Sequence, residues 1–238
     1  MAAYLAILRY DVSYLSNARL LRIWLALLAT PALFLVIVAG TQHELASETL
    51  AAYLGWVLLP LSVGAVAILA GAAINAEARV AADSVLSRAV TRDTYLAAKT
   101  TARLGAVLIV YALVAIPAAG LITRYGVADT SLTGVIAGLA AVAALLWLLT
   151  TAGLALSVLV SRVPLAVLGV VAAAGGLVLT SEVLRLSWLS PLDLVAVLAE
   201  VLRGESSVWR ALTTAIVYTA MGLALLSLAF WRYRTRDL

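Results

Sequence analysis

The sequence has no cysteine and little charge. Without cysteine, the chain cannot form disulfides, thiolate metal sites or a cysteine nucleophile. Charged residues make up only 12% of its 238 residues, and apolar residues make up 65%. Soluble domains average about a quarter charged residues and about half apolar residues. The composition therefore predicts an integral membrane protein.

Patterns that carry catalysis are also lacking. The one histidine, His43, stands beside Glu44, and a single pair of this kind is more often a surface pair than a metal site. Neither the GxSxG nucleophile elbow nor a GxxxxGKS or GxxxxGKT phosphate loop occurs. We therefore expect no enzyme activity, no cofactor and no metal in this chain, and any ATP must be hydrolysed by another polypeptide.

What the sequence does contain is six long apolar runs. The predicted spans are residues 23–40, 50–74, 104–123, 132–160, 164–180 and 211–231. Each run is near the roughly 20 residues that a helix needs to cross the hydrocarbon layer, and its continuous apolarity favours a helix over a strand. No ionisable residue lies in a span core, which argues against a proton- or ion-coupled carrier. Residues 1–238 are therefore predicted to form a single all-α transmembrane domain.

Basic residues are distributed unevenly between the two sides of these spans. Twelve of the sixteen fall on the side of the two termini, and four, Arg124, Arg185, Arg203 and Arg210, fall on the other. Because Lys and Arg are retained in the cytoplasm, we expect a multi-pass protein of the cell membrane with both termini cytoplasmic. We expect the basic residues to contact anionic lipid headgroups. No basic stripe with interleaved aromatics is present, so nucleic acid is not an expected partner.

Residues 1–22 are predicted to form an amphipathic helix in the headgroup layer. Arg9, Ser13, Ser16 and Asn17 lie mostly on its polar face. The residues expected on the apolar face are Tyr4, Ile7, Leu8, Val12 and Leu15. An ordinary cytoplasmic tail that rests on lipid is the alternative.

A second short helix is expected between the fifth and sixth spans, on the outer side. Ser190 followed by Pro191 favours a helix start, because proline is tolerated at the first helical position. The apolar stretch 192–202 is too short to cross the membrane. Trp188 and Trp209 flank the segment, as interfacial aromatic residues often do. We expect this helix to dip part-way into the membrane or to lie on it.

Residues 75–103 form the one sizeable polar segment of the chain. They contain five of the sixteen basic residues and three of the twelve acidic residues. The pattern predicts a cytoplasmic helix, a basic turn and a second helix, with Thr91 as the cap of the second helix and Asp93 and Thr94 in its first turn. Such a hairpin can dock a soluble partner, or its arginines can serve only to hold the topology.

The polar segment contains a recognisable order of residues: Glu77, the stretch LSRAVTR at 86–92, and then Tyr95 and Lys99. This order resembles the cytoplasmic segment of ABC type 2 transporter permeases, which usually reads as a glutamate, LSRPVSR and YLLGK. The segments GLALSVLVSRVPLA (153–166) and LSPL (189–192) and the basic tail WRYRTRD also resemble the family. The chain departs from the pattern at positions 89, 91 and 98, which hold alanine, threonine and alanine.

The resemblance implies the permease subunit of an ATP-driven ABC transporter that exports a small or lipid-like substrate. It also implies that two copies associate as a homo- or heterodimer. An ABC ATP-binding subunit, a separate chain that holds ATP and Mg, would seat the cytoplasmic coupling helix. The implied residues of this coupling interface are Glu77, Leu86, Ser87, Arg88, Val90, Arg92, Tyr95 and Lys99.

Two other functions fit parts of the sequence. A non-transporting membrane scaffold or regulatory subunit would use the same fold to recruit an ATPase. A membrane-embedded enzyme that acts on lipid is the third hypothesis, although no cluster of acid and base residues supports it.

Overall fold

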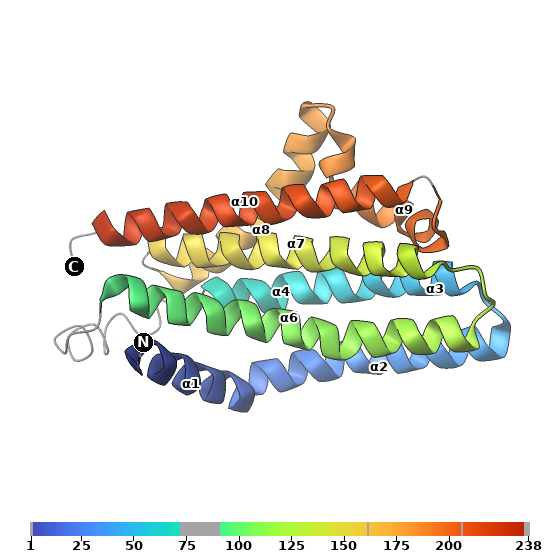
Figure 1. Ribbon diagram of the computed structural model, residues 1–238, viewed down its shortest axis with the longest axis horizontal. Helices are drawn as coiled ribbons and strands as arrows, with labels where there is room; N and C mark the ends of the chain where they lie inside the picture. The colour runs from blue at the N-terminus through green and yellow to red at the C-terminus, as the bar shows by residue number, and fades with distance from the viewer. Residues whose placement is uncertain (1, 72–90, 161, 206, 236–238) are drawn as a thin grey trace.

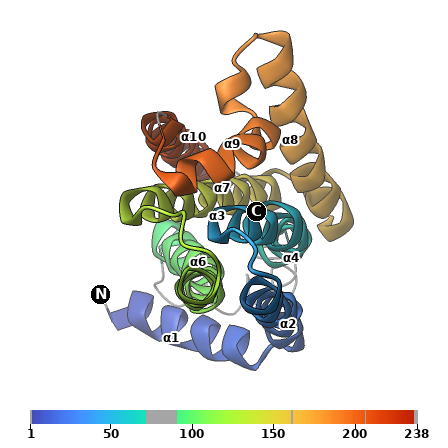
Figure 2. The same cartoon turned by 90° about the vertical axis from the view of Figure 1, so that its right-hand side faces the viewer.

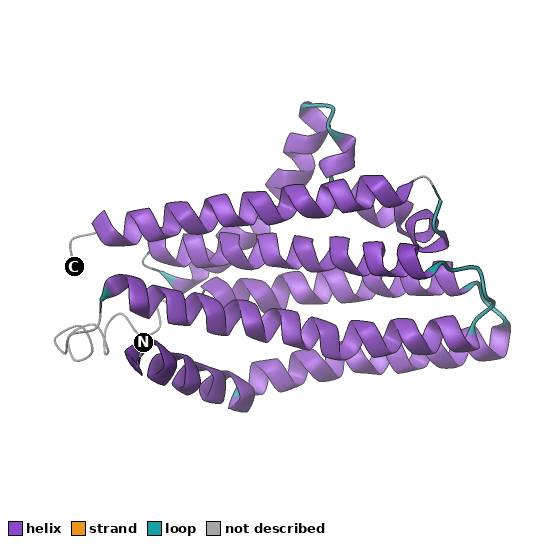
Figure 3. Ribbon diagram, in the orientation of Figure 1, coloured by secondary structure: helices purple, strands orange, loops and turns teal. Residues whose placement is uncertain are grey.

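The computed structural model describes residues 2–71, 91–160, 162–205 and 207–235. Over these residues the chain is built from helices, as Figure 3 shows, apart from one isolated bridge between Leu45 and Val127. Glu77, Leu86, Ser87, Arg88 and Val90 lie outside the described residues, as does most of the predicted coupling helix. The role of these five residues and the coupling helix therefore remain predictions.

Six helices in the described part are long and apolar enough to cross a membrane, which confirms the predicted all-α fold with six spans. The second span is one continuous helix over three segments, α3 (Ala46–Ala52), η1 (Tyr53–Leu58) and α4 (Leu59–Gly71). The other five are α2 (Arg19–Gln42), α6 (Arg92–Tyr125), α7 (Leu132–Leu159), α8 (Val163–Val183) and α10 (Ser207–Thr235).

Two further helices lie where the sequence predicted short ones. The first, α1 (Ala2–Asn17), is separated from α2 at Ala18, whose backbone is extended. The second, α9 (Pro191–Arg203), begins at the predicted proline and ends at Gly204, which has a left-handed φ of 85° that favours glycine. A single 3₁₀ turn, η2 (Ser187–Leu189), precedes α9. The placement of α1 in the headgroup layer and of α9 on the outer side remains a prediction.

The helices form a bundle with α7 at its centre. In Figure 1, α10 lies on one side of α7, and α4, α6 and then α2 lie on the other. The start of α1 and the end of α10 lie at the same end of the bundle, called here the Thr235 end, where α6 also begins. The loops after α2, α6 and α9 lie at the opposite end, called the Gly204 end.

Close contacts of α7 depend on small residues. A Cβ added at Gly134 would collide with the carbonyl oxygens of Val201 and Leu202 on α9. A Cβ at Gly153 would lie 2.6 Å from the Cβ of Ala70 on α4. Without a hydrophobic driving force between helices in lipid, such close approach supplies much of the packing energy.

The fifth span, α8, is the exception to this packing. Only 11% of its most apolar 18-residue stretch is buried inside the protein, compared with 56% of the corresponding stretch of α7. Figure 2 shows that α8 diverges from the bundle towards its Val183 end. Leu168, Leu179 and Val183 on this helix are exposed, so most of α8 is available to lipid or to another chain.

Candidate functional site

Three of the eight predicted coupling residues belong to the described helix α6, which begins directly after the coupling segment. Arg92 is its first residue, and Tyr95 and Lys99 lie in the next two turns. The predicted helix start is confirmed, because the Thr91 hydroxyl accepts a hydrogen bond from the Thr94 N–H at 3.3 Å. Asp93 lies in the first turn, where a carboxylate interacts favourably with the helix dipole.

Helix α6 is much longer than a span requires. Its 34 residues extend over about 51 Å at 1.5 Å per residue, whereas the hydrocarbon layer is about 30 Å thick. The predicted span covers only residues 104–123, so about three turns precede it. A continuous helix therefore connects the end of the coupling segment to the interior of the bundle.

Lys99 lies in a buried contact between α6 and α1. Its Nζ atom donates a hydrogen bond to Oδ1 of Asp11 at 2.7 Å, and the side chains are 2% and 0% exposed. The Lys99 ammonium also stands 5.6 Å from the ring centroid of the half-buried Tyr95. The charge of Lys99, one of the predicted coupling residues, is thus enclosed within the protein, and its coupling role stays a prediction.

A second cation is buried on the same face of α6. Arg103 lies one turn after Lys99 on α6, on the same helix face, and is 6% exposed. Its Nε atom has no hydrogen-bond partner among the described residues, and neither has Oδ2 of Asp11. The same face of α6 thus buries two cations, Lys99 in its pair with Asp11 and Arg103 one turn further on.

Two weaker contacts hold the same part of α6. The Tyr4 hydroxyl on α1 donates to the Thr101 hydroxyl at 3.0 Å. On the other side, Arg234 near the end of α10 pairs with Asp93 at 2.7 Å, with both side chains exposed. The start of α6 is therefore fastened to both α1 and α10. We call Asp11, Asp93, Lys99, Arg103 and Arg234 the α6 N-terminal cluster.

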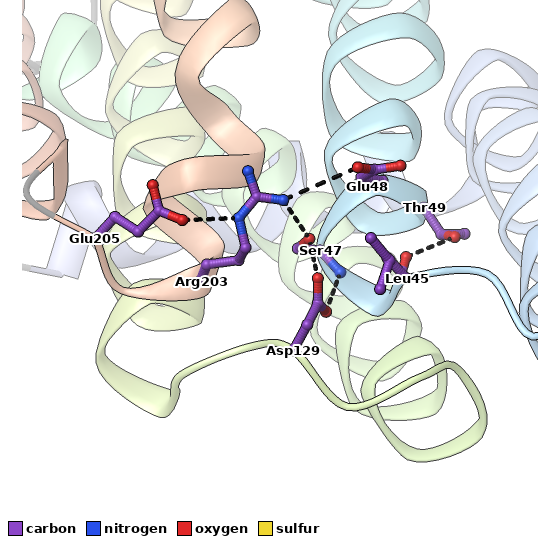
Figure 4. Close-up of polar contacts among 7 residues, drawn as sticks. All are labelled: Leu45, Ser47, Glu48, Thr49, Asp129, Arg203 and Glu205. Carbon is purple, nitrogen blue, oxygen red and sulfur yellow. Dashed lines mark hydrogen bonds and ion pairs between the residues drawn. The ribbon is translucent and has the colours of Figure 1, made fainter.

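A different polar network occupies the Gly204 end, as Figure 4 shows. Ser47 at the start of the second span donates its backbone N–H to Asp129 at 2.9 Å, and its hydroxyl also donates to that carboxylate. Arg203 pairs with Glu205 at 3.0 Å and lies 3.9 Å from Glu48. These contacts connect the start of α3, the loop after α6 and the end of α9.

Backbone hydrogen bonds reinforce this closure. The N–H of Ala46 donates to the carbonyl of Val127 at 3.1 Å, and the N–H of Val127 donates to the carbonyl of Glu44 at 2.9 Å. The N–H of Ser131 donates to the carbonyl of Leu202 at 2.9 Å. The loops at the Gly204 end thus hold one another through the main chain as well as through side chains.

Neither cluster has the composition of a metal site. Within the residues that the structure describes, no group of three or more His, Cys, Asp or Glu side chains could hold a metal ion. The polar groups of both clusters hold helices and loops together, which is a mechanical role.

Sequence reasoning missed Asp11, although a signal for it exists. Asp11 lies between Leu8 and Leu15 at helical spacing, so it interrupts an otherwise apolar face. Asp11 and Leu15 are buried, whereas Val12, which was expected on the apolar face, is 49% exposed. The face of α1 that contacts protein therefore includes Asp11 and Leu15, and the predicted contact of its apolar face with the headgroup layer stays a prediction.

Comparison of the chain with protein-family models and with curated proteins gave no match in either case. The resemblance to ABC type 2 permeases therefore rests on the motifs of the sequence. The contacts of the α6 N-terminal cluster do not depend on that resemblance.

Proposed function

We propose that this chain is the membrane-spanning permease subunit of an ATP-driven ABC transporter that exports a small or lipid-like substrate. A separate ATP-binding subunit supplies the energy, and a second permease copy completes the transporter. The observation that carries the proposal is the α6 N-terminal cluster, which ties α1, α6 and α10 together directly after the predicted docking segment.

The cluster supports a mechanical link between a soluble partner and the spans. A partner that grips residues 75–91 pulls on the first turn of α6. Because α6 continues without a break into the bundle, the displacement reaches the membrane interior. The buried pair of Lys99 with Asp11 makes α1 move together with α6, since separation of the two helices would break a 2.7 Å contact between buried charges.

The proposal places the Thr235 end of the bundle in the cytoplasm, where ATP is available. The excess of arginine on that side supports this orientation. Arg88 and Arg92 then provide positive charge for an acidic groove on the ATP-binding subunit, while Leu86 and Val90 provide apolar anchoring. Lys99 acts behind this surface as a positioning residue that transmits the movement to α1.

The docking step is tested by charge reversal at Arg88 and Arg92. The tagged chain is captured from its native membrane, and bound ATP-binding polypeptides are identified by labelling with azido-ATP. We expect Arg88→Glu with Arg92→Glu to reduce the captured labelled polypeptide at least about tenfold, which corresponds to about 1.4 kcal/mol. The level of inserted chain should not change.

A matched control reverses two exposed arginines elsewhere. Arg124 and Arg185 both belong to the smaller basic group and are exposed. Arg124→Glu with Arg185→Glu changes the net charge equally but should leave capture of the ATPase intact. Equal capture by the wild type and by the Arg88 and Arg92 variant would refute the docking segment.

Transport itself needs a second measurement. The captured complex is placed in vesicles, and ATP hydrolysis is followed while candidate amphipathic compounds are added. Stimulation of hydrolysis together with movement of the compound supports a permease. Tight ATPase capture without any stimulated hydrolysis or transport would instead identify a scaffold or regulatory subunit that recruits an ATPase.

A further inference from the structure

An apolar groove follows the contact between α2 and α6 along the membrane-spanning part of the bundle. It consists of two hollows that adjoin at Leu25 and Leu113, with volumes of about 480 Å³ and about 370 Å³. The first hollow is walled by α1, α2 and α6, and the second by α2 and α6 alone. Figure 2 shows α1 lying across these two helices. We call the two hollows the α2/α6 groove.

The polarity of the groove changes along its length. The second hollow has only apolar residues in its wall, among them Leu33, Val36 and Pro117. The first hollow is also mostly apolar, and its polar residues are Ser16, Arg22 and Thr101. Arg22 therefore places a positive charge at the α1 end of the apolar α2/α6 groove.

The guanidinium of Arg22 can donate hydrogen bonds to an anion. It is exposed, and it donates one hydrogen bond, from Nη2 to the backbone carbonyl of Asn17 at 2.7 Å. No carboxylate in the described part of the chain pairs with it. A guanidinium carries five N–H donors, and phosphate oxygens match their geometry.

We propose that the α2/α6 groove binds a phospholipid with an anionic headgroup, one acyl chain lying along the groove and the phosphate at Arg22. Lipid tails are as apolar as the groove wall, so burial of the tail alone gives no preference for one lipid over another. Selectivity therefore comes from the charge at Arg22, and the shape of the groove holds the tail in place. This inference is independent of any role in transport.

The chain offers a well-matched pair of glycines to test the tail site. A Cβ added at Gly105, which lines the groove, would meet nothing within 4 Å, and the same holds for Gly120 on the same helix, which does not line it. Gly105→Leu therefore fills the groove without a collision with the backbone, and Gly120→Leu is its control. Arg22→Gln tests the headgroup site, and Arg19→Gln, an exposed arginine outside the groove, is its control.

The measurement is native mass spectrometry of the purified full chain in nanodiscs of equal parts phosphatidylglycerol and phosphatidylcholine. We expect the wild type to retain phosphatidylglycerol in preference to phosphatidylcholine. Arg22→Gln should lower this preference about fivefold, the effect of about one basic residue near an anionic surface. Gly105→Leu should abolish retention of the lipid, and neither control should change it.

Three results would overturn the proposal. Equal effects of Arg22→Gln and Arg19→Gln would mean general attraction to the membrane surface rather than a site. Unchanged retention in Gly105→Leu would place the lipid elsewhere. The third result uses a Gly105→Cys variant, which carries a single cysteine because the chain has none of its own. A disulfide between two copies of this variant in lipid would show that a second chain occupies the groove.

Discussion

The two ends of the bundle use polar residues in opposite ways. At the Thr235 end, Asp11 and Lys99 form one ion pair that is almost completely enclosed. At the Gly204 end, Arg203 and its partners are 30% to 59% exposed, and backbone hydrogen bonds share the work of holding the loops. The first arrangement buries its central contact, whereas the second spreads exposed and main-chain contacts over several residues.

This difference determines what each end can do. Loss of one partner from a buried pair costs about 3–5 kcal/mol, because the other charge stays buried and unpaired. An exposed pair contributes only about 0–1 kcal/mol. In the proposed function, the Thr235 end moves as one body when a partner pulls on it, while the Gly204 end can lose single contacts and remain closed.

The largest effect is expected for Asp11→Ala. Removal of this carboxylate takes away the 2.7 Å contact of the buried Lys99 ammonium with α1, so we expect a loss of about 3 kcal/mol in unfolding free energy and release of α1 from α6. Denaturant unfolding in detergent measures the first effect, and hydrogen exchange of residues 3–17 measures the second. Glu205→Ala removes an exposed carboxylate and serves as the control. Equal stability of the two variants would mean that the burial of the pair has no mechanical importance.

A smaller effect is expected for Asp129→Ala at the Gly204 end. The half-buried carboxylate accepts two hydrogen bonds from Ser47, so its removal should cost about 1–3 kcal/mol. Hydrogen exchange should increase in the loop at residues 126–131 but not in α1. Faster exchange in α1 as well would show that the two ends are coupled more tightly than their separation suggests.

The smallest change in stability is expected for the combined substitution Asp11→Leu with Lys99→Met. Apolar side chains of similar size often replace a buried ion pair with little loss, so the unfolding free energy should stay within about 1 kcal/mol of the wild type. The double variant should also restore the slow exchange of α1 that Asp11→Ala loses. Failure to restore it would show that the charges themselves, rather than the filled contact, hold α1 to α6.

Features that depend on near neighbours in sequence were predictable. The cap of α6 at Thr91 and the start of α9 at Pro191 followed from capping and proline preferences. The six spans followed from apolar runs, which a helix in lipid requires. Helix ends differed from the predicted ones chiefly where a helix continues beyond the hydrocarbon layer, as α6 does before residue 104.

Features that join distant parts of the chain were not predictable. Asp11 and Lys99 are 88 residues apart, and Ser47 and Asp129 are 82 apart. The local pattern marks Asp11 as an interruption of an apolar face, but it does not show which residue pairs with it. Lys99 illustrates the point, because its contact with Asp11 depends on how α1 packs on α6.

The amino-acid sequence by itself determined that this chain is a helical, multi-pass membrane protein. Composition and the length of apolar runs are sufficient for that, since lipid permits few other ways to satisfy backbone hydrogen bonds. Tertiary structure alone decided which charges are enclosed, which loops close the Gly204 end and where the α2/α6 groove lies. Those outcomes depend on how helices rotate and cross against one another, and small residues such as Gly134 set that packing only once both partners are in place.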